Sequence, residues 1–185
     1  MRPNGACYAP EMVKAFRTFV AVAALTLWSS TSTPVQAEVP PEGQPLFVVE
    51  RNKNANFVRY EAKLAGDAID TKDPIIAYWI MAAEDGRRES LSAIERALAY
   101  GFSAQPDKKG NIWLTLVSHK TKAIRVFKDA TGVHAEVGIA GKRAYLTKMF
   151  VQAGPEFIPK VIWLDLYGVD AKTGTPLHER IAPSP

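Results

Sequence analysis

The chain has 185 residues, of which 47% are hydrophobic and 23% charged, a composition typical of a globular protein. Its 23 basic and 19 acidic residues give a net charge of +4 at pH 7, and no basic stripe interleaved with aromatic residues is present, which argues against nucleic-acid binding. The single cysteine, Cys7, excludes an internal disulfide and a cysteine-based metal site.

The first 37 residues have the pattern of a secretory signal peptide. Lys14 and Arg17 precede an apolar run at 18–28, and small residues then lead to an expected cleavage after Ala37. The run of eleven residues is shorter than the roughly 20 that span a membrane, so a signal peptide is favoured over a transmembrane anchor. Met12 is an alternative start. The sequence therefore predicts an exported protein, periplasmic or extracellular, with no transmembrane segment.

The mature chain is expected to hold one domain. Residues 38–45 are rich in proline and glycine and read as an N-terminal arm, residues 46–182 carry the patterns of regular structure, and residues 183–185 form a short tail. Removal of residues 1–37 leaves 20 basic and 18 acidic residues and no cysteine, which also excludes a thiol nucleophile.

The most informative stretch begins with a predicted β-hairpin. Two alternating segments flank the turn Asn52-Lys53-Asn54, whose asparagines tolerate left-handed backbone angles. If Val49 pairs with Val58 and Phe47 with Tyr60, one face is apolar and the other carries charge.

This register places Arg51 on the apolar face, at the turn end of the hairpin. An unpaired guanidinium there is costly, so Arg51 needs a partner. Either it reaches the rim or pairs with a structural carboxylate, or it waits for an anionic ligand.

A buried strand and a capped helix follow. Residues 75–83 are apolar apart from the Tyr78 hydroxyl, as in a central strand covered on both faces, where Tyr78 and Trp79 belong to the core or line a pocket. Ser92 and Glu95 form a capping box for a helix at about residues 93–100, and Gly101 ends it. Its expected apolar face is formed by Leu91, Ile94 and Leu98.

The rest of the chain consists of short strands joined by tight turns. Strands adjacent in sequence favour a mainly β fold in which an antiparallel meander closes into a small β-barrel, or forms a two-sheet sandwich, with the one helix across it. The expected strands are 112–118, 123–128, 133–139, 143–152 and 160–170, with 177–181 as a further candidate.

These segments resemble an uncharacterised family of secreted bacterial proteins, the domain of unknown function 4833. The resemblance is carried by ERNKNAN, YWI, DGRRE and ERALAYG and spans most of the mature chain. It implies a recognised unit that follows an export signal, and it implies no catalytic residues.

Motifs of the common enzyme classes are absent from the sequence. There is no GxSxG, P-loop, GxGxxG or HExxH, and the three histidines, His119, His134 and His178, lack ligand-like spacing. No metal and no cofactor are therefore expected.

The carboxylates offer one further candidate. Asp165 shares a strand face with Val161, Trp163 and Tyr167; if that face is interior, Asp165 needs a donor, and Arg51 is the candidate across the core. Asp165 is then either a paired structural ion or an acid with a raised pKa. Glu50, Arg59 and Glu61 are expected to form the charge ladder of a solvated sheet face.

Three functions remain open on the sequence alone. The first is a binding module that takes an anionic or amphipathic small molecule at its open end, with candidate residues Arg51, Asn52, Lys53, Asn54, Tyr78, Trp79 and Asp165. The second is an envelope enzyme that uses Arg51, Asp165 and a tyrosine such as Tyr78 or Tyr100. The third is an assembly protein that docks an envelope partner through a sheet edge or the helix.

Overall fold

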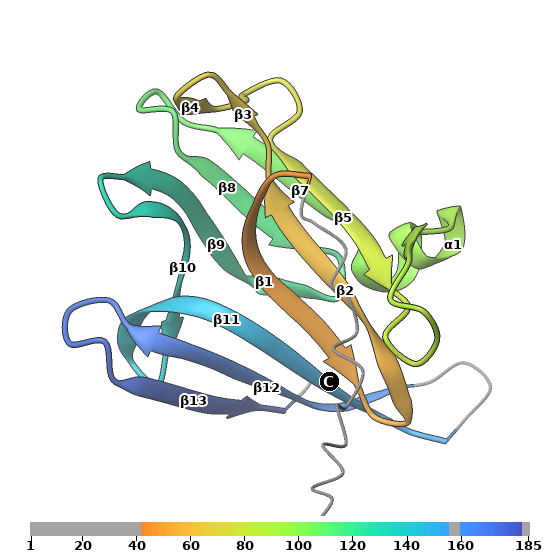
Figure 1. Cartoon of the computed structure of the whole chain (residues 1–185). Coiled ribbons are helices and arrows are strands. Elements are labelled where there is room, and N and C mark those ends of the chain that lie inside the picture. The colour runs from red at the N-terminus through yellow and green to blue at the C-terminus, as the bar shows by residue number, and fades with distance from the viewer. Residues whose placement is uncertain (1–41, 156–159, 183–185) are drawn as a thin grey trace, which may run out of the picture. The chain divides into compact units, whose positions relative to one another are not determined.

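The computed structural model describes residues 42–155 and 160–182, and it is built almost entirely of β-strands (Figure 1). The predicted signal peptide, the first half of the predicted arm and the tail lie outside the described residues. The strands are β1 (Gln44–Arg51), β2 (Asn54–Ala62), β3 (Leu64–Ala65), β4 (Ala68–Ile69), β5 (Ile75–Ile80), β6 (Arg88–Ser90), β7 (Phe102–Pro106), β8 (Ile112–Leu116), β9 (His119–Asp129), β10 (Gly132–Ile139), β11 (Lys142–Ala153), β12 (Val161–Asp170) and β13 (Pro176–Ile181).

Eleven strands belong to one curled sheet, which confirms the mainly β prediction. Nine of them follow the order β6-β5-β2-β1-β11-β10-β9-β8-β7, and β12 and β13 extend from the other edge of β11 (Figure 1). The curl brings Phe102 of β7, at one end of this order, edge-on against Tyr60 of β2, with 6.0 Å between ring centroids. The apolar core fills the inside of the curl, which we call the inner face.

One pairing departs from a simple meander. β1 runs parallel to β11, with Val48 opposite Lys148 and Glu50 opposite Phe150. The same edge of β11 pairs with β10 near its start, while β12 lies along the opposite edge. β11 is thus the branch point of the sheet.

The first hairpin has the predicted register. Phe47 lies opposite Tyr60 and Val49 opposite Val58, and all four side chains are buried on the inner face. The rings of Phe47 and Tyr60 stack with centroids 4.7 Å apart, so this cross-strand pair is a main packing contact of the core.

The predicted central strand is shorter than expected. β5 ends at Ile80, because the amides of Glu84 and Gly86 both turn back to the carbonyl of Met81 and Gly86 has a φ of 74°. Both faces of β5 are covered, as predicted: Ile75 and Ala77 are buried on one face, and Tyr78 and Ile80 on the other.

The single helical segment has the predicted cap but a different buried face. The Ser92 amide donates to Glu95 Oε2 at 2.8 Å and the Glu95 amide to Ser92 Oγ at 3.3 Å, starting α1 (Ala93–Glu95). The segment continues as a π-helical turn, η1 (Arg96–Tyr100).

Tyr100, at the end of the π-helical turn, is buried in the core, in place of Ile94 and Leu98. These two side chains are 71% and 70% exposed, so the predicted face of Leu91, Ile94 and Leu98 is wrong for all but Leu91.

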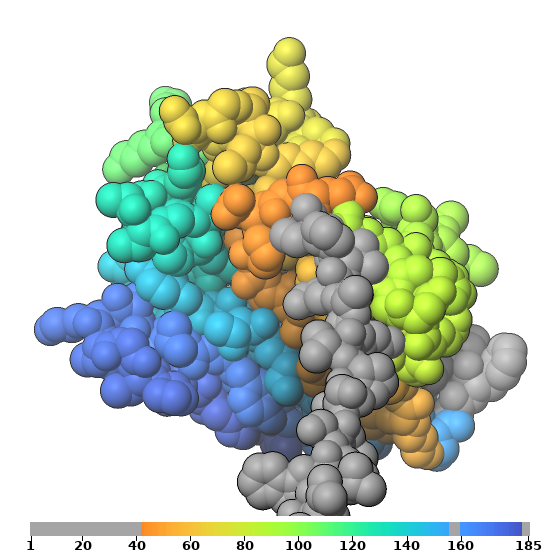
Figure 2. Space-filling model, in the orientation of Figure 1, coloured from red at the N-terminus to blue at the C-terminus, as the bar shows by residue number. Residues whose placement is uncertain are grey.

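The small sheet of β3 and β4 forms a separate hairpin. Lys128 Nζ of β9 donates to the Asp67 carbonyl in its turn at 2.7 Å, and Ile69 joins the core. In the space-filling view this hairpin, in yellow, lies beside the teal residues of the β9–β10 region (Figure 2).

Candidate functional site

The predicted binding turn at the end of the first hairpin is held by hydrogen bonds between its asparagine side chains and backbone groups. Asn52 Nδ2 donates to the Ala153 carbonyl at 3.0 Å, and the Ala153 amide donates to Asn52 Oδ1 at 2.8 Å. Asn54 Oδ1 accepts from the Asn56 amide at 2.9 Å, while Lys53 adopts a left-handed φ of 60°. Asn52 therefore continues the strand pairing of β1 with β11, while Asn54 shapes the turn.

Arg51 has a partner inside the curl, as its position predicted. Its half-buried side chain follows Val49 on the inner face, and it hydrogen-bonds the hydroxyl of Tyr100. Burial raises the pKa of Tyr100, and Arg51 opposes that rise. Tyr60 Oη in turn donates to the Tyr100 carbonyl at 2.6 Å, which links β2, β1 and η1.

Asp165 is a paired ion on the other face of the sheet. Arg180 Nε and Nη2 donate to its two oxygens at 2.8 Å each, and His178 Nε2 lies 2.8 Å from Oδ1. Although Asp165 is only 2% exposed, Arg180 lowers its pKa to about 2, with His178 acting in the same direction against the effect of burial. The candidate pairing with Arg51 is wrong, because alternation places Asp165 opposite Phe150, away from the inner face of Arg51. Of the two alternatives for this carboxylate, a paired structural ion or an acid with a raised pKa, the structure has the paired ion.

Tyr78 and Trp79 point to opposite faces. Trp79 lies inside, packs edge-on against Tyr100 with centroids 5.0 Å apart, and donates from Nε1 to Glu95 Oε1 at 3.0 Å. Tyr78 lies on the outer face, where its hydroxyl donates to Glu61 and the Arg88 guanidinium lies 4.6 Å from the centre of its ring. The candidates named from the sequence therefore do not gather at one place.

Glu61 is the polar residue whose burial departs furthest from the predicted solvated position. It is fully buried, and Arg59 is 8% exposed, so the predicted solvated ladder of Glu50, Arg59 and Glu61 is wrong for these two residues. Glu61 Oε2 accepts from the amides of Glu42 and Gly43 at 2.9 Å each, and Glu61 Oε1 accepts from the Tyr78 hydroxyl. A Cβ at Gly43 would approach the Ala62 carbonyl to 2.4 Å, so glycine permits this close contact.

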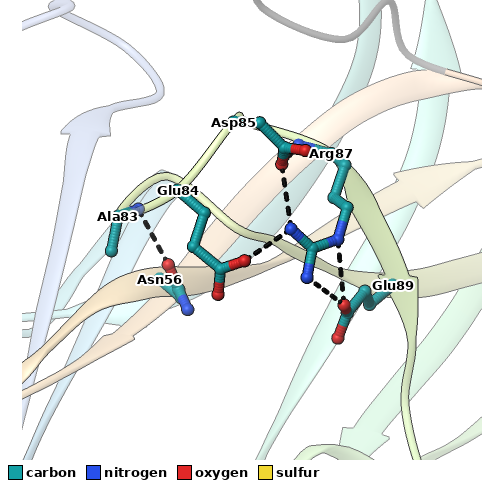
Figure 3. A network of polar contacts seen from close by, with 6 residues as sticks. All are labelled: Asn56, Ala83, Glu84, Asp85, Arg87 and Glu89. Carbon is teal, nitrogen blue, oxygen red and sulfur yellow. Dashed lines mark hydrogen bonds and ion pairs between the residues drawn. The ribbon is translucent and has the colours of Figure 1, made fainter.

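A surface network fixes the turn between β5 and β6 (Figure 3). Arg87 binds Glu84, bonds Glu89 through Nη2 at 2.7 Å, and approaches Asp85 at 3.2 Å, which raises the pKa of Arg87. The Ala83 amide donates to Asn56 Oδ1 at 2.9 Å, which ties the turn to β2. These groups are solvent-exposed, so the network orders the turn and contributes little to stability.

A cavity opens at the end of the curled sheet where β1 finishes. It has a volume of about 290 Å³ and lies between the β8–β9 turn and the ends of β11, β12 and β13. We call it the end pocket. Its lining is apolar on the strands and polar on the turn: Val151, Val161, Leu164, Ile181 and Ala182 face Val117, Ser118, His119, Lys120 and Thr121.

His119 is the distinctive polar group of the end pocket. Its Nε2 is buried and has no hydrogen-bond partner among the described residues. Burial lowers the pKa of His119, and Lys122 lowers it further while Glu179 opposes, so the imidazole is neutral at pH 7. A neutral imidazole in a partly apolar cavity can accept or donate one hydrogen bond to a ligand.

The three histidines occupy three separate neighbourhoods. His119 lines the end pocket, His134 lies 3.2 Å from Asp129 Oδ1, and His178 is bound to Asp165. Within residues 42–155 and 160–182, no three metal-ligating side chains come together. In the same part of the chain, no helix is both long and apolar enough to cross a membrane.

The comparisons with known proteins find one family. The family model described as a domain of unknown function, DUF4833, matches residues 47–180. No curated protein and no solved structure matches the chain.

Proposed function

The chain belongs to the family of the domain of unknown function DUF4833, and we propose that this domain binds a small amphipathic molecule in the end pocket. The observation that carries the proposal is a cavity of about 290 Å³ whose walls are apolar on the strands, with His119 and Lys120 at the β8–β9 turn. Ligand pockets begin at about this size and usually pair an apolar lining with a few polar groups.

The apolar and polar sides of the end pocket indicate how such a ligand would be oriented. The apolar part would rest against Val151, Leu164 and Ile181, which come from three different strands. The polar head would lie at the β8–β9 turn, where His119 offers a hydrogen bond and the exposed Lys120 offers a positive charge. An acidic head group is therefore favoured over a basic one.

The enzyme alternative has less support from the geometry. It requires Arg51 and Asp165 in one cleft with a tyrosine, but Arg51 bonds Tyr100 inside the curl and Asp165 bonds Arg180 outside it. An acid held near pKa 2 by an arginine is also a weak general base at neutral pH.

We further propose that the protein acts after export, in the periplasm or outside the cell. The proposal rests on the charged, apolar and small-residue pattern of residues 14–37. A binding domain in that location would meet small amphipathic molecules of the envelope or the medium.

The test uses 1-anilinonaphthalene-8-sulfonate, an amphipathic anion whose fluorescence rises in apolar sites, with octanoate as a competitor. We expect saturable binding to the folded protein, displacement by octanoate, and affinity reduced about tenfold or more in Val151→Trp, which fills the pocket. Val133→Trp is the matched control, because Val133 is also a partly buried valine packed against the core but lies outside the pocket. Equal loss in both variants, or no saturable binding, would refute the proposal.

A further inference from the structure

A row of large side chains crosses the outer face of the sheet, away from the end pocket. Trp113 of β8 lies opposite Arg125 of β9, Arg125 opposite Glu136 of β10, and Glu136 opposite Tyr145 of β11. Paired residues share a face, so these four side chains stand side by side across four strands. At about 4.8 Å per strand, the row spans roughly 14 Å.

Two open surface hollows lie along this row, and we call the row together with both hollows the trough. One, of about 480 Å³, is lined by Trp113, Arg125 and Glu136 and by the turn before β8; the other, of about 530 Å³, is lined by Tyr145, Arg143 and residues near the turn after β12. Six of the lining side chains are basic and three acidic, an excess close to the net charge of the whole chain. The basic ones are Lys108, Lys109, Arg125, Lys142, Arg143 and Lys172.

Two of the three carboxylates in this trough accept hydrogen bonds from backbone amides of their own turns. Asp107 accepts from the Lys109 and Asn111 amides, and Asp170 accepts from the Lys172 and Thr173 amides. The trough therefore presents a positive surface to an incoming ligand, with one central carboxylate.

That carboxylate, Glu136, lies between two arginines. Arg143 donates to it from Nε at 3.0 Å, and Arg125 Nη1 lies 3.4 Å away. Arg125 Nε is buried and has no hydrogen-bond partner in the described part of the chain. The centre of the trough thus holds one acceptor, the Glu136 carboxylate, flanked by two guanidinium groups.

Among the described residues of this face, Trp113 is the one aromatic side chain that is exposed to solvent. Trp113 is 44% exposed, whereas His134 and Tyr145 stack on each other at 4.3 Å and Arg125 lies 4.3 Å from the centre of the Phe127 ring. A surface that binds single-stranded nucleic acid needs successive free rings for its bases. A phosphodiester backbone also has no donors to offer Glu136.

We propose that this trough binds a linear acidic polysaccharide. Its carboxylates would pair with the lysines and arginines, its hydroxyls would donate to Glu136, and the C–H face of one sugar ring would rest on Trp113. The site is separate from the end pocket, so this inference stands independently of the proposed function.

The experiment measures binding of hexagalacturonate, an acidic hexasaccharide, to the full-length mature protein by calorimetry. We expect binding that weakens as salt rises, no binding of the neutral maltohexaose, and affinity about tenfold lower in Trp113→Ala. Lys108→Glu should weaken binding by a similar factor, whereas Lys72→Glu, the same change in another exposed turn, should not. Val151→Trp should leave this binding intact, which separates the two sites.

Three results would overturn the inference. The first is no binding of hexagalacturonate, and the second is equal weakening by Lys108→Glu and Lys72→Glu. The third is tighter binding of a twelve-residue oligothymidylate, which would identify the trough as a nucleic-acid surface instead. Thermal unfolding of each variant checks that it is folded.

Discussion

A single buried carboxylate shows how far the burial of a side chain can differ from the exposure that its strand sequence predicts. Glu61 lies in an alternating strand among charged neighbours, as a solvated residue would, yet it is fully buried. It accepts from Tyr78 and from the Glu42 and Gly43 amides, which come from residues that precede β1. Sequence alternation identifies which face a residue shares, but it does not tell what covers that face.

Removal of the Glu61 carboxylate should therefore be costly. In Glu61→Ala the Tyr78 hydroxyl and two backbone amides lose their acceptor, and we expect the free energy of unfolding to fall by about 3 kcal/mol, measured by urea denaturation. Glu50→Ala is the control, because Glu50 lies on a partly exposed surface and pairs with Lys148 at 3.1 Å, so about 0.5 kcal/mol is expected. Similar losses in both variants would contradict the role assigned to Glu61.

Asp165 is expected to make the folding stability depend on pH. Its pKa is lowered from 3.8 to about 2 in the folded protein, so the carboxylate contributes stability above pH 4 and loses that contribution as the pH falls through about 2. We expect the urea midpoint of Asp165→Asn to lie well below that of the wild type at pH 6 and to approach it at pH 2. Asp67→Asn, at an exposed aspartate, serves as the control. A gap that stays constant with pH would show that the ion pair is not its cause.

At the scale of elements, the sequence was most informative where partners are close along the chain. The register of β1 with β2 follows from alternation and a short turn, and the cap of α1 follows from Ser92 and Glu95. The parallel pairing of β1 with β11 could not be predicted, because no local pattern records which distant strand completes an edge. The π turn could not be predicted either, because apolar spacing in a sequence is interpreted with the ordinary α-helical period.

The helical segment offers a matched pair of substitutions. Leu91 is 5% exposed and Leu98 is 70% exposed. Leu91→Ala should lower the free energy of unfolding by about 3 kcal/mol because it leaves a cavity, whereas Leu98→Ala should change it by less than about 0.5 kcal/mol. Chemical denaturation of both variants measures this difference. If Leu98→Ala proved as damaging as Leu91→Ala, the originally predicted face would be the buried one after all.

At the scale of the whole molecule, the candidate site was only partly accessible from the sequence. The expectation of a ligand site at the open end near Arg51 concerns the same end of the sheet as the end pocket, because Val151 lies opposite Arg51 and also lines that pocket. The residues that line the pocket come from four separate stretches that only the tertiary fold brings together. His119 was noted as an isolated histidine, since its burial depends on strands far away in sequence.

Export is tested on the whole chain. Expression with its own N-terminus in a bacterial host should yield a mature protein that begins at Glu38 and is recovered outside the cytoplasm, because cleavage is expected after Ala37. Intact-mass measurement and N-terminal sequencing identify the start. An Ala37→Leu variant, which places a large residue at the expected cleavage site, should accumulate uncleaved. Cytoplasmic recovery of the uncleaved wild type would rule out the proposed location.

The branch at β11 also sets the order in which the chain can fold. The side chain of Asn52 bonds Ala153, 101 residues further on, so β1 gains its second neighbour only after most of the domain has left the ribosome. Until then the edge of the first hairpin stays unpaired, and such long-range closure is typical of folding on the order of milliseconds to seconds. Until β11 arrives, the free edge of β1 can pair with a strand of another chain, so the last strands of the domain also protect the first ones from aggregation.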